Sequence, residues 1–483
     1  MKDYRSLQAV QADLFSGEIS CVQLTNEYLK RIREHEQLNI FLETFEESAL
    51  KKAKEVDEKI ANKQAGKLAG MVISIKDNIC YKGHKVSASS KILEGFESLY
   101  SATVVERLLA EDAIIIGRTN CDEFAMGSSN ENSAYGAVKH PNIENKVPGG
   151  SSGGAAASVA AGMCLASLGS DTGGSIRQPA SFCGNIGLKP TYGRISRHGL
   201  IAYASSFDQI GPFTNCIEDS AILLEVMAGK DEYDSTLSAR EVPAYSQKVK
   251  ESTSDKKRIA YLDCYVEHEG LNEEVKNRTV EIIKSLEAEG HTVEKISFDL
   301  LDQLVPAYYV LTTAEASSNL ARYDGVHFGY RSPNATDLLS TYVKSRSEGF
   351  GPEVKRRIML GTYVLSAGYY DAYYSKAQKV RRIVKEQTRK VLADYDFIIS
   401  PTTPHPAFDL NSQVDDPIKM YLEDIFTVQA NIAGLPAISL PLGETKEKHP
   451  FGIQLMADVF QEEKLLSFSK QLMNKYSLKK GEA

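Results

Sequence analysis

Two short segments rich in glycine and serine each combine a hydroxyl group with a glycine backbone. The first is GGSSGG at 149–154, which contains Ser151, and the second is DTGGSIR at 171–177, which contains Ser175. Glycine has no Cβ, so backbone N–H groups in such segments can approach a ligand closely. The apolar run 155–162 between them argues against a flexible linker. The pair therefore has the composition of a nucleophile with an anion-stabilising backbone.

A serine hydroxyl is a poor nucleophile at neutral pH and needs a neighbouring base. Gly149, Ser151 and Gly153 have the G-x-S-x-G spacing of the α/β-hydrolase elbow, which requires a strand directly upstream. Pro148 argues against a central strand at that point. The downstream histidines have no distinctive setting; they are His198, His268, His291, His327, His405 and His449. A Ser-His-Asp site is therefore disfavoured.

Phosphate and metal sites are also disfavoured. A phosphate-binding loop of the G-x-x-x-x-G-K type needs a lysine after its last glycine, and Gly154 is followed by Ala155. The nine histidines show neither an H-E-x-x-H motif nor the spacing of metal ligands. We expect no metal ion or cofactor in this chain.

A lysine is the remaining type of base. Residues 70–78 alternate as a strand does, and Lys76 closes the apolar part of this run. A lysine at the end of a strand is commonly solvated, but Asp77 and Asn78 follow directly and indicate a polar cluster. A buried lysine can have a strongly lowered pKa and accept a proton, and serine–lysine sites are variants of triad chemistry. Spacing alone does not pair Lys76 with Ser151 or Ser175.

Composition limits the class of protein. The 483 residues are 42% hydrophobic and 25% charged, enough for a large core, and the net charge of −8 argues against direct binding to nucleic acid phosphates. The seven cysteines occur singly, which is typical of reduced thiols. Residues 1–5 begin no apolar segment and the run 155–169 is too short to span a bilayer. We expect a cytoplasmic protein with no membrane contact.

Strand and helix patterns alternate along the chain and predict an α/β fold, a large mixed sheet covered by helices on both faces. We expect one domain over 1–483, with residues 301–393 mostly helical. Further helices are expected near 20–33, 46–64, 104–112, 154–162 and 272–289, and strands near 40–45, 70–76, 113–117, 165–168, 258–262, 291–296, 396–400 and 437–440.

The run from Gly149 to Pro179 resembles the signature of the amidase signature family. The resemblance implies the amidase signature fold, with a core of about 70–215, and a Ser–cis-Ser–Lys triad. In that triad Ser175 would be the acyl-forming nucleophile, Ser151 the bridging serine after a cis peptide bond, and Lys76 the base.

The same resemblance implies an oxyanion hole. Its donors would be the backbone N–H groups of the second glycine-rich segment, Thr172, Gly173, Gly174 and Ser175. Ser128 and Ser152 could also form hydrogen bonds near the site, although small polar residues in tight loops are usually structural.

Three further segments, 119–129, 187–194 and 354–361, are similar to the A subunits of tRNA-dependent glutamyl-tRNA(Gln)/aspartyl-tRNA(Asn) amidotransferases. That resemblance implies a glutaminase within a heterotrimer. Ammonia from glutamine would pass to a B subunit, which would bind ATP, Mg and most of the tRNA and amidate the mischarged tRNA. A small C subunit would bridge the other two, and the complex as a whole would be a ligase acting on tRNA(Gln), tRNA(Asn) or both.

By the same resemblance, Arg357 would hold the α-carboxylate of glutamine with its planar donor fork, Asp424 would hold the α-ammonium group, and Tyr308 would line the pocket. From the pattern alone, Arg357 and Asp424 read as helix-surface residues, and Arg356 is an alternative to Arg357.

Two other functions stay open. One is a free-standing amidase acting on small aryl or aliphatic amides, and the other is an amidase-like scaffold that only binds partners. The presence of Lys76, Ser151 and Ser175 weighs against the scaffold. The pair Arg357 and Asp424, with no membrane-anchoring segment, weighs against a lipophilic amide.

Overall fold

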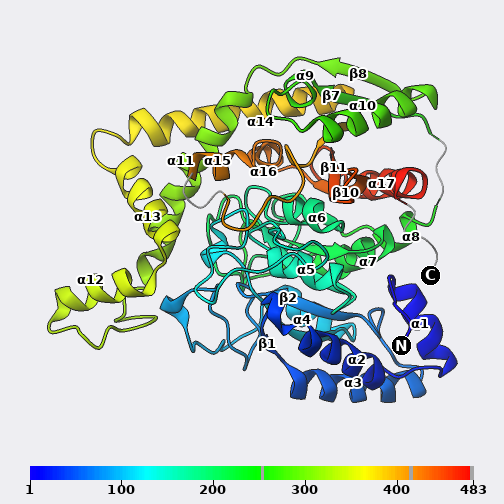
Figure 1. Cartoon of the computed structure of the whole chain (residues 1–483), viewed down its shortest axis with the longest axis horizontal. Helices are drawn as coiled ribbons and strands as arrows, with labels where there is room; N and C mark the ends of the chain where they lie inside the picture. Colours follow the sequence, from blue (N-terminus) through cyan, green and yellow to red (C-terminus); the bar gives the residue numbers. More distant parts are fainter. Residues whose placement is uncertain (252–254, 413–416, 479–483) are drawn as a thin grey trace.

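All strands of the described residues join one sheet. The computed structural model describes residues 1–251, 255–412 and 417–478, so small parts of the expected domain 1–483 lie outside the described residues. The sheet has eleven strands in the order β1-β3-β2-β4-β6-β5-β10-β11-β9-β7-β8 (Figure 1). The strands are β1 Phe41–Thr44, β2 Val72–Lys76, β3 Ile114–Thr119, β4 Ala166–Asp171, β5 Ile186–Lys189, β6 Gln209–Thr214, β7 Arg258–Leu262, β8 Thr292–Ile296, β9 Phe397–Pro401, β10 Ala437–Glu444 and β11 Pro450–Met456.

The sheet is mixed, as predicted. β2 pairs in parallel with β3 and β4, and β7 pairs in parallel with β8 and β9. The strands between these groups pair antiparallel, from β4 through β6, β5, β10 and β11 to β9. Every residue of β2, β3 and β4 is buried, so both faces of this part of the sheet are covered.

The helices cover both faces and both ends of the sheet. Figure 1 shows α1–α3 at the end near β1 and α10 and α14 at the opposite end. The helices are α1 Leu7–Ser16, α2 Cys21–Glu34, α3 Glu46–Ala61, α4 Thr103–Ala110, α5 Gly153–Ala160, α6 Arg177–Cys183, α7 Ile217–Met227, α8 Tyr245–Lys248, α9 Asp263–Val266, α10 Glu273–Ala288, α11 Leu301–Asn319, α12 Leu338–Gly349, α13 Pro352–Leu365, α14 Lys376–Asp394, α15 Pro417–Leu422, α16 Val428–Ala433 and α17 Glu462–Tyr476.

Local sequence signals account for many of these elements. Ser20 and Gln23 form the predicted capping box at the start of α2. The small-residue helix α5 is buried from Gly153 through Val159, which allows it to pack directly against β2 and β4. The predicted polar cluster after β2 is also present, because Asp77 pairs with Arg118 at 2.6 Å.

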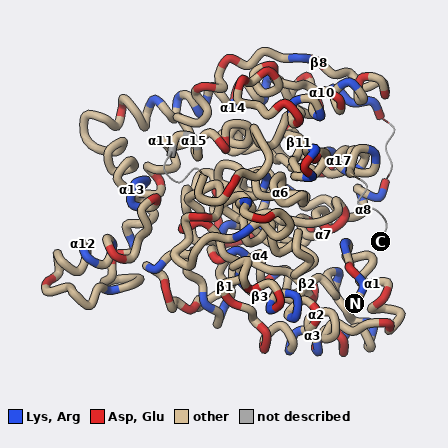
Figure 2. The backbone as a smooth tube through the Cα atoms, in the orientation of Figure 1, with Lys and Arg blue, Asp and Glu red and all other residues tan. Residues whose placement is uncertain are grey.

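The surface of the protein has a helical projection and a mixed distribution of charge. Helices α12 and α13 extend away from the rest of the molecule (Figure 1), and α13 packs along α11. Acidic and basic residues are interspersed along the visible chain (Figure 2). Within the described ranges, no helix combines the length and the apolar character that a membrane span requires.

Candidate active site

The side chain of Lys76 ends inside a cluster of serines. Lys76 is the last residue of β2 and is fully buried. Its Nζ lies 2.7 Å from Ser151 Oγ, 2.9 Å from Ser152 Oγ and 3.0 Å from Ser170 Oγ. Burial away from water lowers the pKa of Lys76 to about 8. This amine can therefore be neutral, and accept a proton, close to neutral pH.

The three serine hydroxyls around Lys76 differ in their other hydrogen-bond partners, and Ser151 Oγ has none besides Lys76 among the described residues. The Ser152 hydroxyl donates to the Ser170 carbonyl oxygen at 3.1 Å, so Ser152 Oγ accepts from Lys76. Ser170 Oγ also accepts from Asn78 Nδ2 at 2.9 Å. A neutral lysine has two N–H groups and one lone pair. When its hydrogens are donated to Ser152 and Ser170, its lone pair is free to accept from Ser151.

Ser151 lies in the first glycine-rich loop. The Gly150–Ser151 peptide bond is cis, as the resemblance implies. The backbone N–H of Asp122 donates to the Ser151 carbonyl at 3.1 Å, and the N–H of Gly150 donates to Gln178 Oε1 at 2.9 Å. Residues 145–150 contain no strand, so Ser151 is not on the elbow of an α/β-hydrolase.

Ser175 lies in the loop that joins the end of β4 to the start of α6. It is 7% exposed, and its hydroxyl has no hydrogen-bond partner within the described ranges. The N–H of Ser152 donates to the Ser175 carbonyl at 3.3 Å, which joins the two glycine-rich loops. The sequence could not pair the two loops with Lys76, and the structure brings all three segments together.

The backbone preceding Ser175 is free to bind an anion. The N–H groups of Gly173, Gly174 and Ser175 donate to no acceptor in the part of the chain that the structure describes. The side chain of Thr172 has a separate partner, because its hydroxyl donates to a carboxylate oxygen of Asp208 at 2.7 Å. Unpaired, preorganised N–H groups beside a hydroxyl are the arrangement of an oxyanion hole.

Tyr308 packs against this second loop. A Cβ built on Gly173 would lie 2.5 Å from the Tyr308 ring, so the ring occupies the space that a side chain at position 173 would need. Tyr308 is on α11 and is buried. It therefore lies against the glycine-rich loop that precedes Ser175.

Arg357 is the inward-facing arginine of α13. Its side chain is 3% exposed, whereas that of Arg356 is 43% exposed. Its Nε donates to Glu353 at 2.7 Å and its Nη1 to the Tyr203 hydroxyl at 2.9 Å. The guanidinium carries five N–H groups, so three remain available to a ligand. The rings around it, at 5.1–5.5 Å, are those of Tyr203, Tyr309 and Tyr421.

Asp424 supplies a buried carboxylate near this arginine. It accepts from the Tyr309 hydroxyl at 3.2 Å and from the Ser128 hydroxyl at 3.4 Å. Burial raises the pKa of Asp424 to about 7, and the nearby Arg357 limits that rise. The site thus has a cation and an acid that can match the opposite charges of an amino acid's α-carboxylate and α-ammonium groups.

Several residues at this site were not among the predicted ones. Tyr309 follows the predicted Tyr308, and Glu353 lies one helical turn before Arg357, so proximity to a predicted residue is the only signal for either. Ser170 directly precedes the predicted segment 171–177 and Thr427 lies three residues after Asp424, but neither has a distinctive pattern of its own. Among the described residues, no group of three or more His, Cys, Asp or Glu could hold a metal ion.

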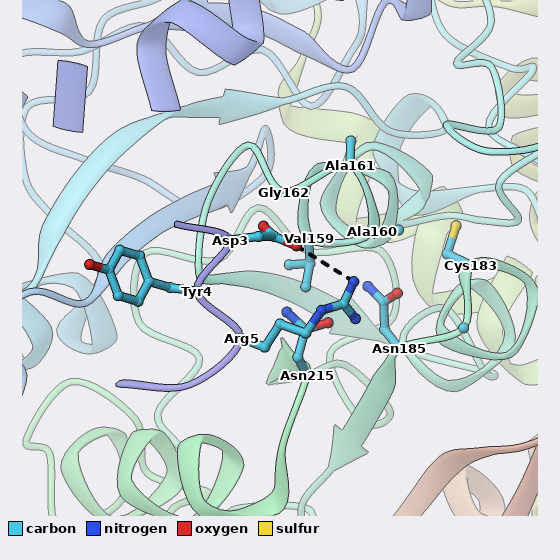
Figure 3. A pocket seen from close by; sticks show the side chains of 11 residues that line it. Asp3, Tyr4, Arg5, Val159, Ala160, Ala161, Gly162, Cys183, Asn185 and Asn215 are labelled. Atoms are coloured by element: carbon cyan, nitrogen blue, oxygen red, sulfur yellow. Dashed lines mark ion pairs between the residues drawn. The ribbon is translucent and has the colours of Figure 1, made fainter. Parts of the chain in front are cut away.

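A separate small hollow lies at the C-terminal end of α5, the end away from Ser151, beside the N-terminal segment of the chain (Figure 3). Its volume is about 90 Å³, and Asp3 and Arg5 at its edge form an ion pair at 3.7 Å. Since α5 starts at the first glycine-rich loop, about 12 Å of helix separates this hollow from Ser151. The hollow is therefore distinct from the serine–lysine site.

Comparison with known proteins agrees with the geometry. The family model described as Amidase matches residues 23–466. The A subunit of the glutamyl-tRNA(Gln) amidotransferase from Chlorobium limicola is 51% identical over 471 residues, which are 97% of this chain and 99% of the relative.

Solved structures of related proteins are similar to this chain over nearly its whole length. The A subunit of the Thermotoga maritima glutamyl-tRNA(Gln) amidotransferase has a TM-score of 0.76 at 38% identity, and the match covers 94% of this chain and 93% of that one. The native peptide amidase from Stenotrophomonas maltophilia has a TM-score of 0.82 at 27% identity, and the match covers 98% of this chain and 96% of that one. The predicted amidase signature fold is confirmed.

Proposed function

The chain belongs to the amidase family and to its branch of glutamyl-tRNA(Gln) amidotransferase A subunits, and from this membership we propose that it is the glutaminase of such a complex. The observation that carries the proposal is the pairing of two features in one site. A lysine–serine cluster lies beside free backbone N–H groups. Thr427 connects that backbone to the turn of Asp424, a buried carboxylate whose charge interacts with Arg357. Free glutamine offers a carboxamide, a carboxylate and an ammonium group to match.

In the proposed reaction, Ser175 Oγ attacks the carboxamide carbon of glutamine. Its proton passes through the Ser151 hydroxyl to Lys76, whose Nζ lies 2.7 Å from Ser151 Oγ. The negative charge on the former carbonyl oxygen is stabilised by the N–H groups of residues 172–175. The carbon–nitrogen bond then breaks, the proton returns to the nitrogen, and ammonia leaves an ester on Ser175. Water hydrolyses this ester to glutamate by the same proton route.

Substrate selection is assigned to the second part of the site. The three free N–H groups of Arg357 bind the α-carboxylate in a forked arrangement. Ionised Asp424 binds the α-ammonium group. Tyr308 packs against the oxyanion loop and fills the space beside Gly173.

The wider assembly follows from the branch of the family. We propose a cytoplasmic heterotrimer in which a B subunit binds ATP, Mg and tRNA and uses the ammonia to convert Glu-tRNA(Gln) to Gln-tRNA(Gln), while a C subunit bridges the other two. Acidic and basic residues are interspersed in this chain and its net charge is −8, which supports assigning the tRNA to a partner.

A second candidate is a free-standing amidase. The specific observation in its favour is the high structural similarity to a peptide amidase that is only 27% identical in sequence. The two functions differ in substrate, because small aryl or aliphatic amides lack the charges that Arg357 and Asp424 would bind.

The deciding experiment has two arms. Affinity purification from the native source is expected to recover two specific partners, and the purified complex is expected to release ammonia from glutamine. Ser175→Ala is expected to abolish the release while the complex still assembles. Rapid turnover of an aryl amide by the isolated chain, with no turnover of glutamine in either form, would establish the amidase instead.

A further inference from the structure

Thr427 is a buried residue that contacts the candidate oxyanion loop directly. Its hydroxyl donates to the Gly173 carbonyl oxygen at 2.6 Å. A Cβ built on Gly174 would lie 2.2 Å from Thr427 Oγ1, and Gly174 has a φ of 144°, which favours glycine. Thr427 therefore occupies the space against the loop that the absence of a side chain at position 174 leaves open.

This contact has a consequence for the orientation of one peptide group. The C=O of Gly173 and the N–H of Gly174 belong to the same planar trans peptide and point in opposite directions. With the carbonyl held by Thr427, the Gly174 N–H is turned away from Thr427. That N–H has no acceptor among the described residues, as expected for a donor that would bind an oxyanion.

Thr427 is also tied to the turn that carries Asp424. Its hydroxyl lies 3.0 Å from the Asp424 carbonyl oxygen, and its backbone N–H donates to the same oxygen at 3.0 Å. Arg177 Nη1 donates to the Thr427 carbonyl at 2.9 Å, while the same guanidinium pairs with Asp171 at the end of β4. One residue thus joins the turn that carries Asp424 to the backbone of the oxyanion loop.

We infer that Thr427 is a positioning residue that transmits occupancy of the Asp424 site to the oxyanion loop. An α-ammonium group bound at Asp424 holds the 424–427 turn in place, and the Thr427 hydroxyl then holds the 173–174 peptide with its N–H toward the reacting carbonyl. The inference rests on the proposed glutaminase function. The contact between the α-ammonium group and Asp424, although remote from the carboxamide, would then stabilise the transition state more than the bound substrate.

Coupling through Thr427 predicts different kcat values for substrates with and without an α-amino group. Glutaramic acid has the same carboxamide and a carboxylate but no α-amino group. If the coupling operates, the unsubstituted complex turns over glutamine with a higher kcat than glutaramic acid even at saturation. A pocket that only binds the ammonium group would change KM and leave kcat alike for both.

The test uses the purified complex and two substitutions of one side chain. Thr427→Val keeps the shape and removes the hydroxyl, and it is expected to lower kcat for glutamine by about 10²-fold, the order of one lost oxyanion-hole donor. The glutamine-to-glutaramate ratio of kcat is expected to fall close to one. Thr427→Ser keeps the hydroxyl and is expected to restore both kcat and the ratio.

Asp424→Asn, with Thr427 intact, supplies a second measurement that does not depend on the folding of Thr427→Val. It removes the carboxylate that attracts the ammonium group and is expected to collapse the same ratio. A ratio that stays at the unsubstituted value in Thr427→Val or in Asp424→Asn, or a Thr427→Ser complex that behaves as Thr427→Val, would overturn the inference. No turnover of glutamine by the unsubstituted complex would overturn the proposed function, and the inference with it.

Discussion

The amine of Lys76 lies 2.7 Å from the hydroxyl oxygen of Ser151, at the end of a fully buried strand and next to a cis peptide bond. The same amine is hydrogen-bonded to two further serine hydroxyls, so its environment is polar. The Lys76 side chain is also fully buried. Among the described residues Ser151 Oγ has no other hydrogen-bond partner, so its hydroxyl hydrogen is free to be donated to a neutral Lys76 amine. The Lys76–Ser151 contact is therefore the centre of the proposed chemistry.

The first prediction concerns the pH dependence of glutamine hydrolysis. The pKa of Lys76 is lowered to about 8, so the amine is protonated below that pH and neutral above it. A base must be neutral to accept a proton, and kcat/KM for glutamine is therefore expected to rise as the pH increases through 8 and to level off above it. A pH–rate profile of the complex measures this. A rate that falls as the pH rises through 8 would contradict the role of base.

Removal of the amine provides the matching substitution. Lys76→Met is similar in length and uncharged, and it is expected to abolish glutamine turnover because no proton acceptor remains at Ser151. Thermal unfolding and assembly with the partner subunits serve as controls for folding. Turnover near the unsubstituted level in a folded Lys76→Met complex would be incompatible with the assignment.

The second prediction concerns Ser170, which accepts hydrogen bonds from Lys76 and Asn78. Without this acceptor one amine hydrogen loses its partner, and the amine is less well oriented to accept a proton from Ser151. Ser170→Ala is expected to lower kcat by about tenfold, the effect of one lost hydrogen bond to a polar amine, with KM for glutamine nearly unchanged. Ser170→Thr retains a hydroxyl and is expected to keep most of the activity. Equal losses in the alanine and threonine variants would point to packing alone.

Much of this site could be predicted from the sequence, for reasons that differ among its parts. The two glycine-rich loops and the strand ending at Lys76 have local signals, because glycine spacing and strand alternation act within a few residues. Their meeting could not be derived from spacing, since it depends on the neighbouring placement of β2 and β4 in the sheet. The assignment of Lys76, Ser151 and Ser175 to one triad came from resemblance to a family.

Some strands were not predicted because tertiary contacts override their local pattern. β6 contains Gly211 and Pro212, which are unfavourable inside a strand. A Cβ on Gly211 would lie 2.0 Å from the Leu188 carbonyl oxygen, so close packing of the neighbouring strand requires glycine there. In β11 the buried Gln454 interrupts the apolar pattern, and its side chain accepts from Arg177 at 2.5 Å. Polar positions of this kind serve distant partners that a local pattern does not reveal.

The third prediction concerns the affinity for glutamine at low pH. Burial raises the pKa of Asp424 to about 7, so the side chain becomes neutral as the pH falls through 7. A neutral Asp424 no longer attracts the α-ammonium group, and KM for glutamine is therefore expected to rise as the pH falls below 7. KM for glutaramic acid, which has no such group, is expected to stay nearly constant over the same range. A parallel rise for both substrates would assign the effect to another group.

The fourth prediction concerns Glu353, which lies one helical turn before Arg357 on α13. Its carboxylate accepts from Arg357 Nε at 2.7 Å and from the Tyr421 hydroxyl at 3.0 Å, and it is buried. With Nε bonded to Glu353 and one Nη1 hydrogen to the Tyr203 hydroxyl, the guanidinium is held in one orientation, and its other three N–H groups would bind the ligand. Glu353 is therefore expected to orient the group that binds the α-carboxylate.

Glu353→Gln keeps the size of the side chain but weakens its bond to the guanidinium, and KM for glutamine is expected to rise by about tenfold or more, as for a weakened charge-assisted hydrogen bond. The kcat is expected to change little, because Lys76, Ser151 and Ser175 are untouched. Arg356→Gln is the matched control: Arg356 also pairs with Glu353, but its side chain is 43% exposed, whereas that of Arg357 is 3% exposed. Steady-state kinetics of the two variants separate the contributions, since the control is expected to leave KM almost unchanged. An equal rise in both variants would mean that the surface pair, rather than the buried contact with Arg357, sets the affinity.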